Sequence, residues 1–257
     1  MDGRFEGAGL VAEHYFHKDG VTLYTGDAAA GLAWLPGGSA DCVVTSAPRW
    51  RNGEVTGKRG QDLCIGREPT AQGYVERLRS VFAELGRVVR DTGTVWLNVG
   101  TPRAGTSVGQ AGMPWRVVFA LQRDGWLLRN AVVWRRSQMA APIEGRLSSC
   151  YETIFLLTKK PRYYFDSVRA RSGAIGDVWL LGDAAGPGLS AEVAARCISA
   201  GCPAGGVVLD PFSGAAASGV VARRLGRAYV GIDVDAGCHA DALRRFGLTN
   251  NRDRSAA

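Results

Sequence analysis

The chain has 257 residues, of which 46% are hydrophobic, so it can bury one sizeable core and is ordinary in composition for a globular protein. Its 31 basic and 24 acidic residues give a net charge of +7, which favours a polyanionic partner without identifying one. The six cysteines form no CxxC pair, no segment is typical of a signal peptide, and no apolar run is long enough to cross a bilayer. We therefore expect one reduced, cytoplasmic domain over residues 1–257, with flexible ends at 1–20 and 248–257 and with neither metal nor membrane contact.

Short β-branched runs alternate along the chain with segments of helical periodicity, which is typical of a mostly parallel sheet covered by helices. The predicted strands are Val21–Thr25, Asp41–Thr45, Thr94–Val99, Ala131–Arg135, Thr153–Thr158, Val207–Asp210 and Ala228–Asp233. The predicted helices are Pro69–Arg90, Trp115–Leu121, Ala191–Ile198, Val220–Leu225 and Ala240–Phe246. This order predicts an α/β protein with a doubly wound sheet.

A polar motif closes the second of these strands. It consists of Thr45-Ser46-Ala47-Pro48-Arg49-Trp50. Proline keeps the preceding residue out of the α region, so Pro48 restrains the Ala47 carbonyl in an extended segment. Taken alone, the motif is also compatible with a plain turn at the end of a strand.

A second motif closes the strand Val207–Asp210 and precedes a predicted helix, which is where α/β sheets bind ligands. It consists of Asp210-Pro211-Phe212-Ser213-Gly214, followed by three alanines and Ser218. About 20 residues further on, Asp233 ends the next strand, where its carboxylate suits the two hydroxyls of a ribose. A G-x-G-x-x-G fingerprint is absent, so a nicotinamide dinucleotide is poorly supported.

The two motifs resemble those of the amino-group DNA methyltransferases. The first is similar to the Ser-Pro-Pro-aromatic catalytic motif of that family, and the second to its Asp-Pro-Phe-x-Gly motif for S-adenosyl-L-methionine. A catalytic motif that precedes the cofactor motif is typical of the β class. The resemblance extends from Leu23 to Phe246. It implies a Rossmann-like, seven-stranded, mostly parallel methyltransferase sheet with a circularly permuted motif order.

The resemblance also implies roles for the first motif. Exocyclic amino groups are poor nucleophiles, because the nitrogen lone pair is delocalised into the base, and an enzyme must position the nitrogen and accept its hydrogens. Ser46 and the Ala47 carbonyl would accept these hydrogens, and Pro48 would stiffen the carbonyl. Arg49 or Trp50 would stack on the flipped base.

S-adenosyl-L-methionine is the cofactor that the resemblance implies. The residues expected to bind it are Asp27, Asn98, Asp210, Pro211, Phe212, Ser213, Gly214, Ser218 and Asp233. Asp233 would bind the ribose, Asp27 would lie near the adenine, and Gly214 would let the backbone approach the methionine part.

Several positions depart from the family pattern. Ala47 stands where a proline is usual and Arg49 where an aromatic residue is usual. In the cofactor motif, Ala216 replaces a glycine and Ala217 a threonine, and a histidine-containing segment before Ala191 is missing. These departures leave an alternative open, namely a catalytically degenerate module that binds DNA or a protein partner.

Basic residues gather near the predicted target side of the molecule, as expected for a protein that neutralises phosphates. The predicted DNA contacts are Arg51, Lys58, Arg59, Arg135, Arg136 and Arg162. The chain lacks a sizeable target-recognition insert, because the stretches at Thr101–Ala111 and between Asp166 and Asp177 are short. Sequence readout needs an element that reaches base edges, so specificity would come from small loops, a partner or a homodimer.

The predicted function is methylation of an exocyclic amino group in DNA. Cytosine-N4 is favoured over adenine-N6, because the Ser-x-Pro form of the catalytic motif is commoner among cytosine-N4 enzymes. A second alternative, methylation of a small amine, is motivated by the missing recognition insert.

Overall fold

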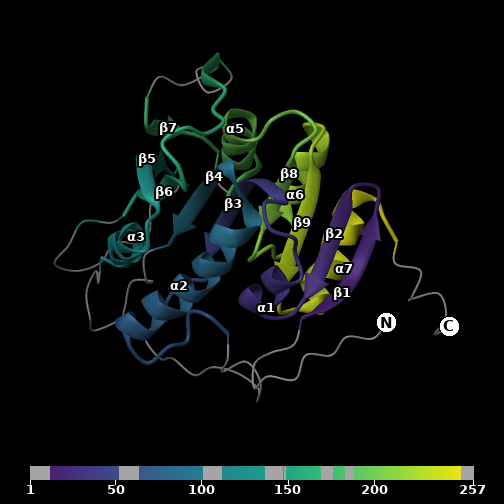
Figure 1. The fold of residues 1–257 in the computed structure, drawn as a ribbon, viewed down its shortest axis with the longest axis horizontal. Helices are drawn as coiled ribbons and strands as arrows, with labels where there is room; N and C mark the ends of the chain where they lie inside the picture. The colour runs from purple at the N-terminus through teal and green to yellow at the C-terminus, as the bar shows by residue number, and fades with distance from the viewer. Residues whose placement is uncertain are drawn as a thin grey trace.

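The computed structural model describes residues 12–51, 64–100, 112–136, 147, 149–168, 176–182 and 188–249. Within this part of the chain, nine strands form one sheet in the order β1-β2-β9-β8-β3-β4-β6-β5-β7 (Figure 1). The strands are β1 Glu13–Lys18, β2 Val21–Thr25, β3 Ala40–Ala47, β4 Val89–Val99, β5 Leu127–Arg135, β6 Tyr151–Thr158, β7 Val178–Leu180, β8 Val207–Asp210 and β9 Ala228–Asp233. The helices are α1 Ala28–Ala33, α2 Ala71–Val88, α3 Met113–Arg123, α5 Ala191–Gly201, α6 Ala217–Arg224 and α7 Ala236–Phe246.

The central strands β2, β9, β8, β3 and β4 are all parallel to one another. Their carboxyl ends therefore lie along one edge of the sheet, which we call the carboxyl edge. Strand β6 is antiparallel to β4, so its first residues lie at this same edge, and β5 is antiparallel to β6, so it ends there. The result is the Rossmann-like methyltransferase fold that the sequence predicts, with two further strands.

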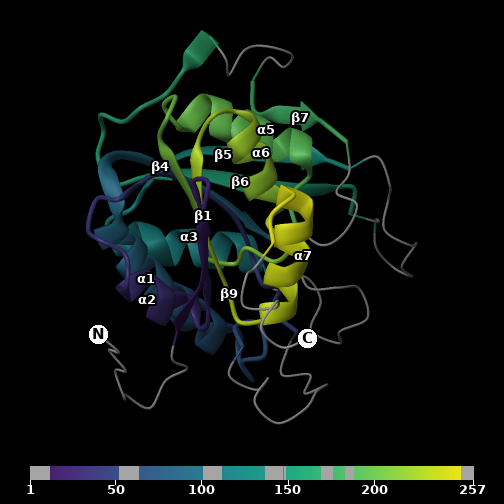
Figure 2. The ribbon, with the colours of Figure 1, turned by 90° about the vertical axis from the view of Figure 1, so that its right-hand side faces the viewer.

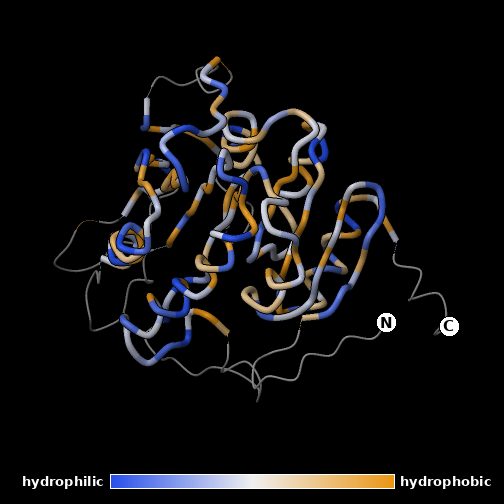
Figure 3. The backbone as a smooth tube through the Cα atoms, viewed as in Figure 1, coloured by the Kyte–Doolittle hydropathy of each residue, from blue (hydrophilic) through white to orange (hydrophobic). Residues whose placement is uncertain are grey.

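Helices cover both faces of the sheet, and Figure 2 shows the two layers from the side. Helices α1, α2 and α3 bury Leu32, Leu78 and Val118 in one apolar cluster, and α5, α6 and α7 bury Ile198 and other residues in a second. In α2, every third or fourth residue is apolar and faces the sheet, as the sequence predicts. Hydropathy follows this arrangement, with apolar segments along the central strands (Figure 3). No helix in the described ranges is both long and apolar enough to span a membrane.

All seven predicted strands form, several of them longer than predicted, but β1, β7 and α1 were not predicted. Strand β1 pairs with β2, so the prediction that the whole of 1–20 is a flexible end is wrong for residues 13–20. Most of its side chains are exposed, because it is an edge strand, and its sequence lacks the alternation of a half-buried strand. Strand β7 has three residues and α1 has six, which is too short for a periodic signal.

The entry into α6 has a left-handed backbone at a residue that is not glycine. Ala216 has φ 54° and ψ 45°, and its side chain is fully buried. A left-handed conformation costs an L-residue about 1–2 kcal/mol, whereas glycine adopts it readily. This is the position at which the family pattern has glycine.

We therefore expect Ala216→Gly to stabilise the protein by about 1 kcal/mol, since relief of backbone strain outweighs the loss of one methyl group. Urea denaturation measures the change. Ala217→Gly is the matched control, because Ala217 is helical and glycine there lowers the stability. An Ala216→Gly variant no more stable than the Ala217→Gly variant would show that the left-handed backbone of Ala216 is not strained.

Candidate catalytic and cofactor site

Residues from both predicted motifs meet at the carboxyl edge. Ser46 pairs in register with Asn98 of the neighbouring strand, and Asp210 closes β8 on the other side of β3. Asp233 closes β9, and the amide of Gly26, next to Asp27, donates to its backbone oxygen. The residues of the two motifs, which are far apart in sequence, therefore lie along one edge of the sheet, where we predict a single site.

Ser46 takes part in a hydrogen-bond chain whose directions are fixed. Its hydroxyl donates to Asn98 Oδ1 at 2.8 Å, and Asn98 Nδ2 donates to the Thr153 backbone oxygen at 3.2 Å. A backbone carbonyl can only accept, so the Asn98 side chain must direct its oxygen toward Ser46. The Ser46 proton is thereby committed to Asn98, and the lone pairs of Ser46 Oγ face away from that bond. Asn98, predicted to bind the cofactor, also contacts Ser46, the predicted catalytic serine, directly.

Asp210 is a buried carboxylate with three donors. The hydroxyls of Thr45 and Ser218 each donate to it at 2.7 Å, and the Phe212 amide donates at 3.1 Å. Burial removes the carboxylate from water and raises the pKa of Asp210 to about 6, although these hydrogen bonds partly oppose the shift. Burial, together with Asp210, also raises the pKa of the neighbouring Tyr229 phenol. The motif thus holds a carboxyl group in an environment that disfavours its ionised form.

The remaining cofactor candidates surround the turn between β8 and α6. Asp233 Oδ2 accepts from the Gly214 amide at 2.8 Å, and its Oδ1 accepts from the Asp235 amide at 3.0 Å. Pro211 and Ser213 are buried, and Phe212 packs against the core at its edge. Asp27 caps α1 by accepting from the amides of two alanines. The carboxylates of Asp27 and Asp233 are therefore both oriented by backbone amides.

Residues 47–50, which follow Ser46 and which together with it we call the catalytic segment from their predicted role, pack against the core and form hydrogen bonds with it. Ala47 is buried, and the Tyr74 hydroxyl donates to the Pro48 oxygen at 2.8 Å. The Trp50 side chain is only 5% exposed and donates its indole N–H to the Glu68 backbone oxygen at 2.8 Å. Trp50 is therefore a core residue, and the prediction that it could stack on a base is wrong. Arg49 remains as the stacking candidate.

Arg49 lies over the end of β4 and binds a buried acid. Its guanidinium contacts Glu152 Oε1 at 2.6 Å, and Arg136 contacts the same oxygen at 2.7 Å. The Glu152 side chain is 9% exposed. A Cβ built on Gly100 would come within 2.8 Å of Arg49 Cγ, so the arginine stem needs a glycine beneath it.

Three of the predicted DNA contacts follow strands that end at the carboxyl edge. Arg51 is exposed and comes shortly after β3, and Arg135, which is exposed, and Arg136 stand at the end of β5. Arg162 follows β6 at the opposite edge, where the Tyr164 amide donates to the Thr92 backbone oxygen, so its assignment to the same surface is wrong. The error arose because β6 runs antiparallel to β4. Lys58 and Arg59 lie outside the described residues.

Sequence reasoning missed three residues of this site. Thr45 holds Asp210, Tyr74 holds Pro48, and Glu152 holds Arg49. Each has a polar group in a strand or on a helix face that is mainly apolar. A polar group in such a place needs a partner, and this could have marked the three residues in the sequence. Their partners could not be read from the sequence, because each contact joins segments that are distant along the chain.

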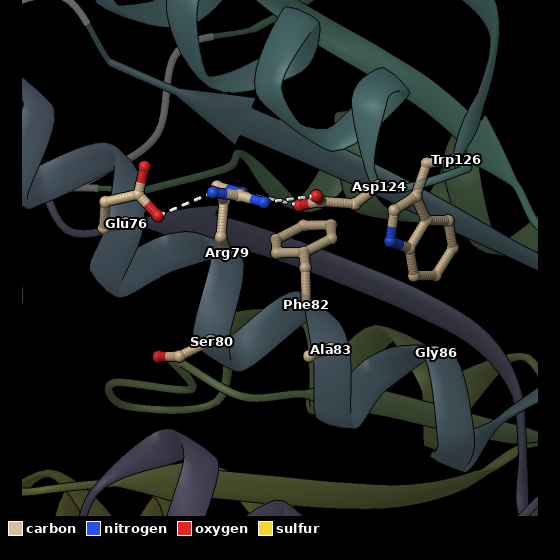
Figure 4. Close-up of a pocket in the computed structure, with 8 residues that line it drawn as sticks. All are labelled: Glu76, Arg79, Ser80, Phe82, Ala83, Gly86, Asp124 and Trp126. Carbon is tan, nitrogen blue, oxygen red and sulfur yellow. Dashed lines mark hydrogen bonds and ion pairs between the residues drawn. The ribbon is translucent and has the colours of Figure 1, made fainter.

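A surface groove of about 560 Å³ lies elsewhere, between α2 and the turn after α3 (Figure 4). Arg79 bridges Asp124 and Glu76 across it. Its eight lining residues include none of the predicted catalytic or cofactor residues. It is therefore separate from the candidate site.

The raised pKa of Asp210 predicts a measurable effect on stability. The folded protein binds the Asp210 proton more tightly than the unfolded chain, so this contribution to stability is present below pH 4 and is lost as the pH rises through about 6. Asp210→Asn lacks this dependence. Its free energy of unfolding, relative to that of the unmodified protein, should rise by about 1 kcal/mol between pH 5 and pH 8.

Urea denaturation at both pH values measures this difference. Asp91→Asn is the control, because Lys159 lowers the pKa of Asp91, so this carboxylate is ionised in both the folded and the unfolded chain across the range. The relative stability of the control should therefore stay constant between the two pH values. An unchanged difference between Asp210→Asn and the unmodified protein would show that burial does not raise the pKa of Asp210.

Comparison with known proteins agrees with this geometry. Residues 40–174 and 188–244 match the DNA methylase family. Type II methyltransferase M.Cfr9I of Citrobacter freundii is 34% identical over 84% of each chain, and M.SmaI of Serratia marcescens is 32% identical over 83% of this chain and 86% of its own. The solved structure of PvuII DNA methyltransferase (cytosine-N4-specific) has a TM-score of 0.75 and 18% identity, covering 90% of this chain and 87% of the other. The chain therefore belongs to the DNA methylase family, in the permuted β class of S-adenosyl-L-methionine-dependent amino-methyltransferases.

Proposed function

We propose that the protein methylates an exocyclic amino group of a base in DNA, and that the base is cytosine, modified at N4, rather than adenine, modified at N6. One observation carries the proposal. The Ser46 hydroxyl is committed as a donor to Asn98, so its lone pairs are directed toward an incoming donor such as an amino group. The cytosine preference rests on the Ser-x-Pro form of the motif.

The described residues fit S-adenosyl-L-methionine. A Cβ built on Gly214 would meet no atom within 4 Å, so there is space beside the backbone where the methionine part would lie. Asp233, whose carboxylate the Gly214 amide orients, would bind the ribose hydroxyls, and Asp27, which caps α1 next to the end of β2, would lie near the adenine. When bound, the cofactor supplies an electrophilic methyl group on a sulfonium.

The catalytic segment prepares the nucleophile. Ser46 Oγ and the Ala47 carbonyl accept the two amino hydrogens, and this draws the nitrogen lone pair out of conjugation with the base. The nitrogen becomes positive when its bond to the methyl carbon has formed, and the hydrogen held by Ser46 then leaves as a proton to solvent water, while Ser46 keeps its own proton in the bond to Asn98. The Asn98 and Thr153 contacts keep the Ser46 oxygen in place during this change.

DNA as the substrate is supported by charge. Arg51, directly after the predicted catalytic motif, and Arg135, at the end of β5 on the carboxyl edge, are both exposed. The whole chain carries a net charge of +7. Cations at the mouth of the site would neutralise phosphates on either side of a flipped base.

The test is product analysis with a serine variant. The protein is incubated with S-adenosyl-L-methionine and unmethylated genomic DNA, and N4-methylcytosine and N6-methyladenine are quantified by mass spectrometry after digestion to nucleosides. We expect N4-methylcytosine, and a loss of about 100-fold in rate for Ser46→Ala.

Ser80→Ala is the matched control, since Ser80 is exposed on α2 and should tolerate the change. N6-methyladenine as the sole product would overturn the cytosine preference. A Ser46→Ala variant as active as Ser80→Ala would remove the proposed role of the serine, and no methylated base at all would contradict DNA methylation.

A further inference from the structure

Arg49 occupies the position at which the family pattern has an aromatic residue, and the structure holds it rigidly. Its guanidinium contacts Glu152 Oε1 at 2.6 Å, and that oxygen also contacts Arg136 at 2.7 Å. The Glu152 side chain is 9% exposed, so this carboxylate is largely withdrawn from water. An arginine held by a buried carboxylate loses much of the rotational freedom of a surface side chain.

Glycines lie against both the side-chain stem and the backbone of Arg49. A Cβ on Gly100 would come within 2.9 Å of Arg49 Cδ, and a Cβ on Gly66 would come within 2.6 Å of the Arg49 backbone oxygen. Both glycines leave room that any other residue would fill. The Arg49 stem therefore lies against Gly100, just beyond the end of β4, and the side chain is 38% exposed.

Glu152 also lowers the positive charge near the place where the amino nitrogen would react. A cation close to the amino nitrogen opposes catalysis, because that nitrogen becomes positive as the methyl group is transferred. The Glu152 carboxylate contacts the guanidinium directly and lowers the positive potential there, although it is shared with Arg136, so the three side chains together keep one positive charge. The flat face of the guanidinium still stacks on aromatic rings.

We propose that the Arg49 guanidinium is the platform on which the flipped target base stacks, and that Glu152 is the positioning residue that fixes its plane and partly offsets its charge. This inference rests on the proposed function. It assigns to Arg49 the part that an aromatic ring plays in the family pattern, and it assigns phosphate contact to the exposed Arg51 instead.

Two substitutions of Arg49 separate shape from charge. Arg49→Lys keeps the charge and loses the plane, so kcat/KM for DNA methylation should fall by about 10- to 100-fold, the range that corresponds to loss of base stacking. Arg49→Tyr loses the charge and restores a flat ring, so its loss should be at least about tenfold smaller. The opposite order, with lysine better than tyrosine, would overturn the proposal.

A double variant tests the role of Glu152. Glu152→Gln should lower kcat/KM by about tenfold in the unmodified protein, with affinity for S-adenosyl-L-methionine retained. In the Arg49→Tyr background the same change should cost less than about twofold, because Glu152 acts through Arg49. An equal loss in both backgrounds would mean that Glu152 only supports the fold. Should Glu152→Gln alone fail to fold, the comparison of lysine with tyrosine still decides the proposal.

Affinity for DNA gives a readout that does not depend on turnover. Binding of a labelled random-sequence duplex is measured against salt concentration. Arg51→Gln should reduce the slope of log K against log salt by about 1, as a phosphate contact requires, whereas Arg49→Tyr should leave the slope unchanged. Arg49→Lys should weaken binding at every salt concentration with the slope preserved.

The outcomes distinguish the two proposals. Binding that follows this pattern without methylation would refute the proposed function and keep the stacking platform. Methylation with a reduced slope for Arg49→Tyr would keep the function and make Arg49 a phosphate contact, which overturns the platform. A protein that binds no DNA would overturn both.

Discussion

The hydrogen bond between the Thr45 hydroxyl and the buried Asp210 carboxylate, 2.7 Å long, joins the ends of two neighbouring parallel strands. It connects the strand that carries the catalytic segment to the strand that begins the cofactor turn, across 165 residues of sequence. Ser46 is the next residue after Thr45, and Ser218 binds the other oxygen of Asp210. Asp210 therefore fixes the position of Thr45, next to Ser46, relative to the first turn of α6.

This arrangement is costly for the folded protein. A carboxylate removed from water is unstable, and the pKa of Asp210 near 6 means that it must ionise against that cost at neutral pH. A left-handed Ala216 adds strain within the same turn. Both costs lie at the cofactor motif, where proteins commonly retain strain for the sake of function. The apolar clusters on the two faces of the sheet supply the stability that offsets them.

The sequence was sufficient to predict the central sheet and to predict that the two motifs lie at the same edge of it. Both motifs follow strands, and the carboxyl ends of parallel strands lie along one edge of a sheet. The sequence was insufficient to predict the role of a residue whose partner is distant along the chain. Trp50 is buried because its indole N–H finds a partner in the Glu68 backbone oxygen, 18 residues further along the chain, and that contact could not be read from the motif. Arg162 was misplaced because the direction of β6 is a property of the whole sheet.

The most direct test of the account is calorimetric titration of the protein with S-adenosyl-L-methionine, compared with the variant Asp233→Ala. The account predicts one site per chain, and it predicts that removing the Asp233 carboxylate beside Gly214 abolishes measurable binding. A folded, unmodified protein that gives no binding would contradict the claim that the carboxyl edge is a cofactor site. Equal affinity in the variant would place the cofactor elsewhere.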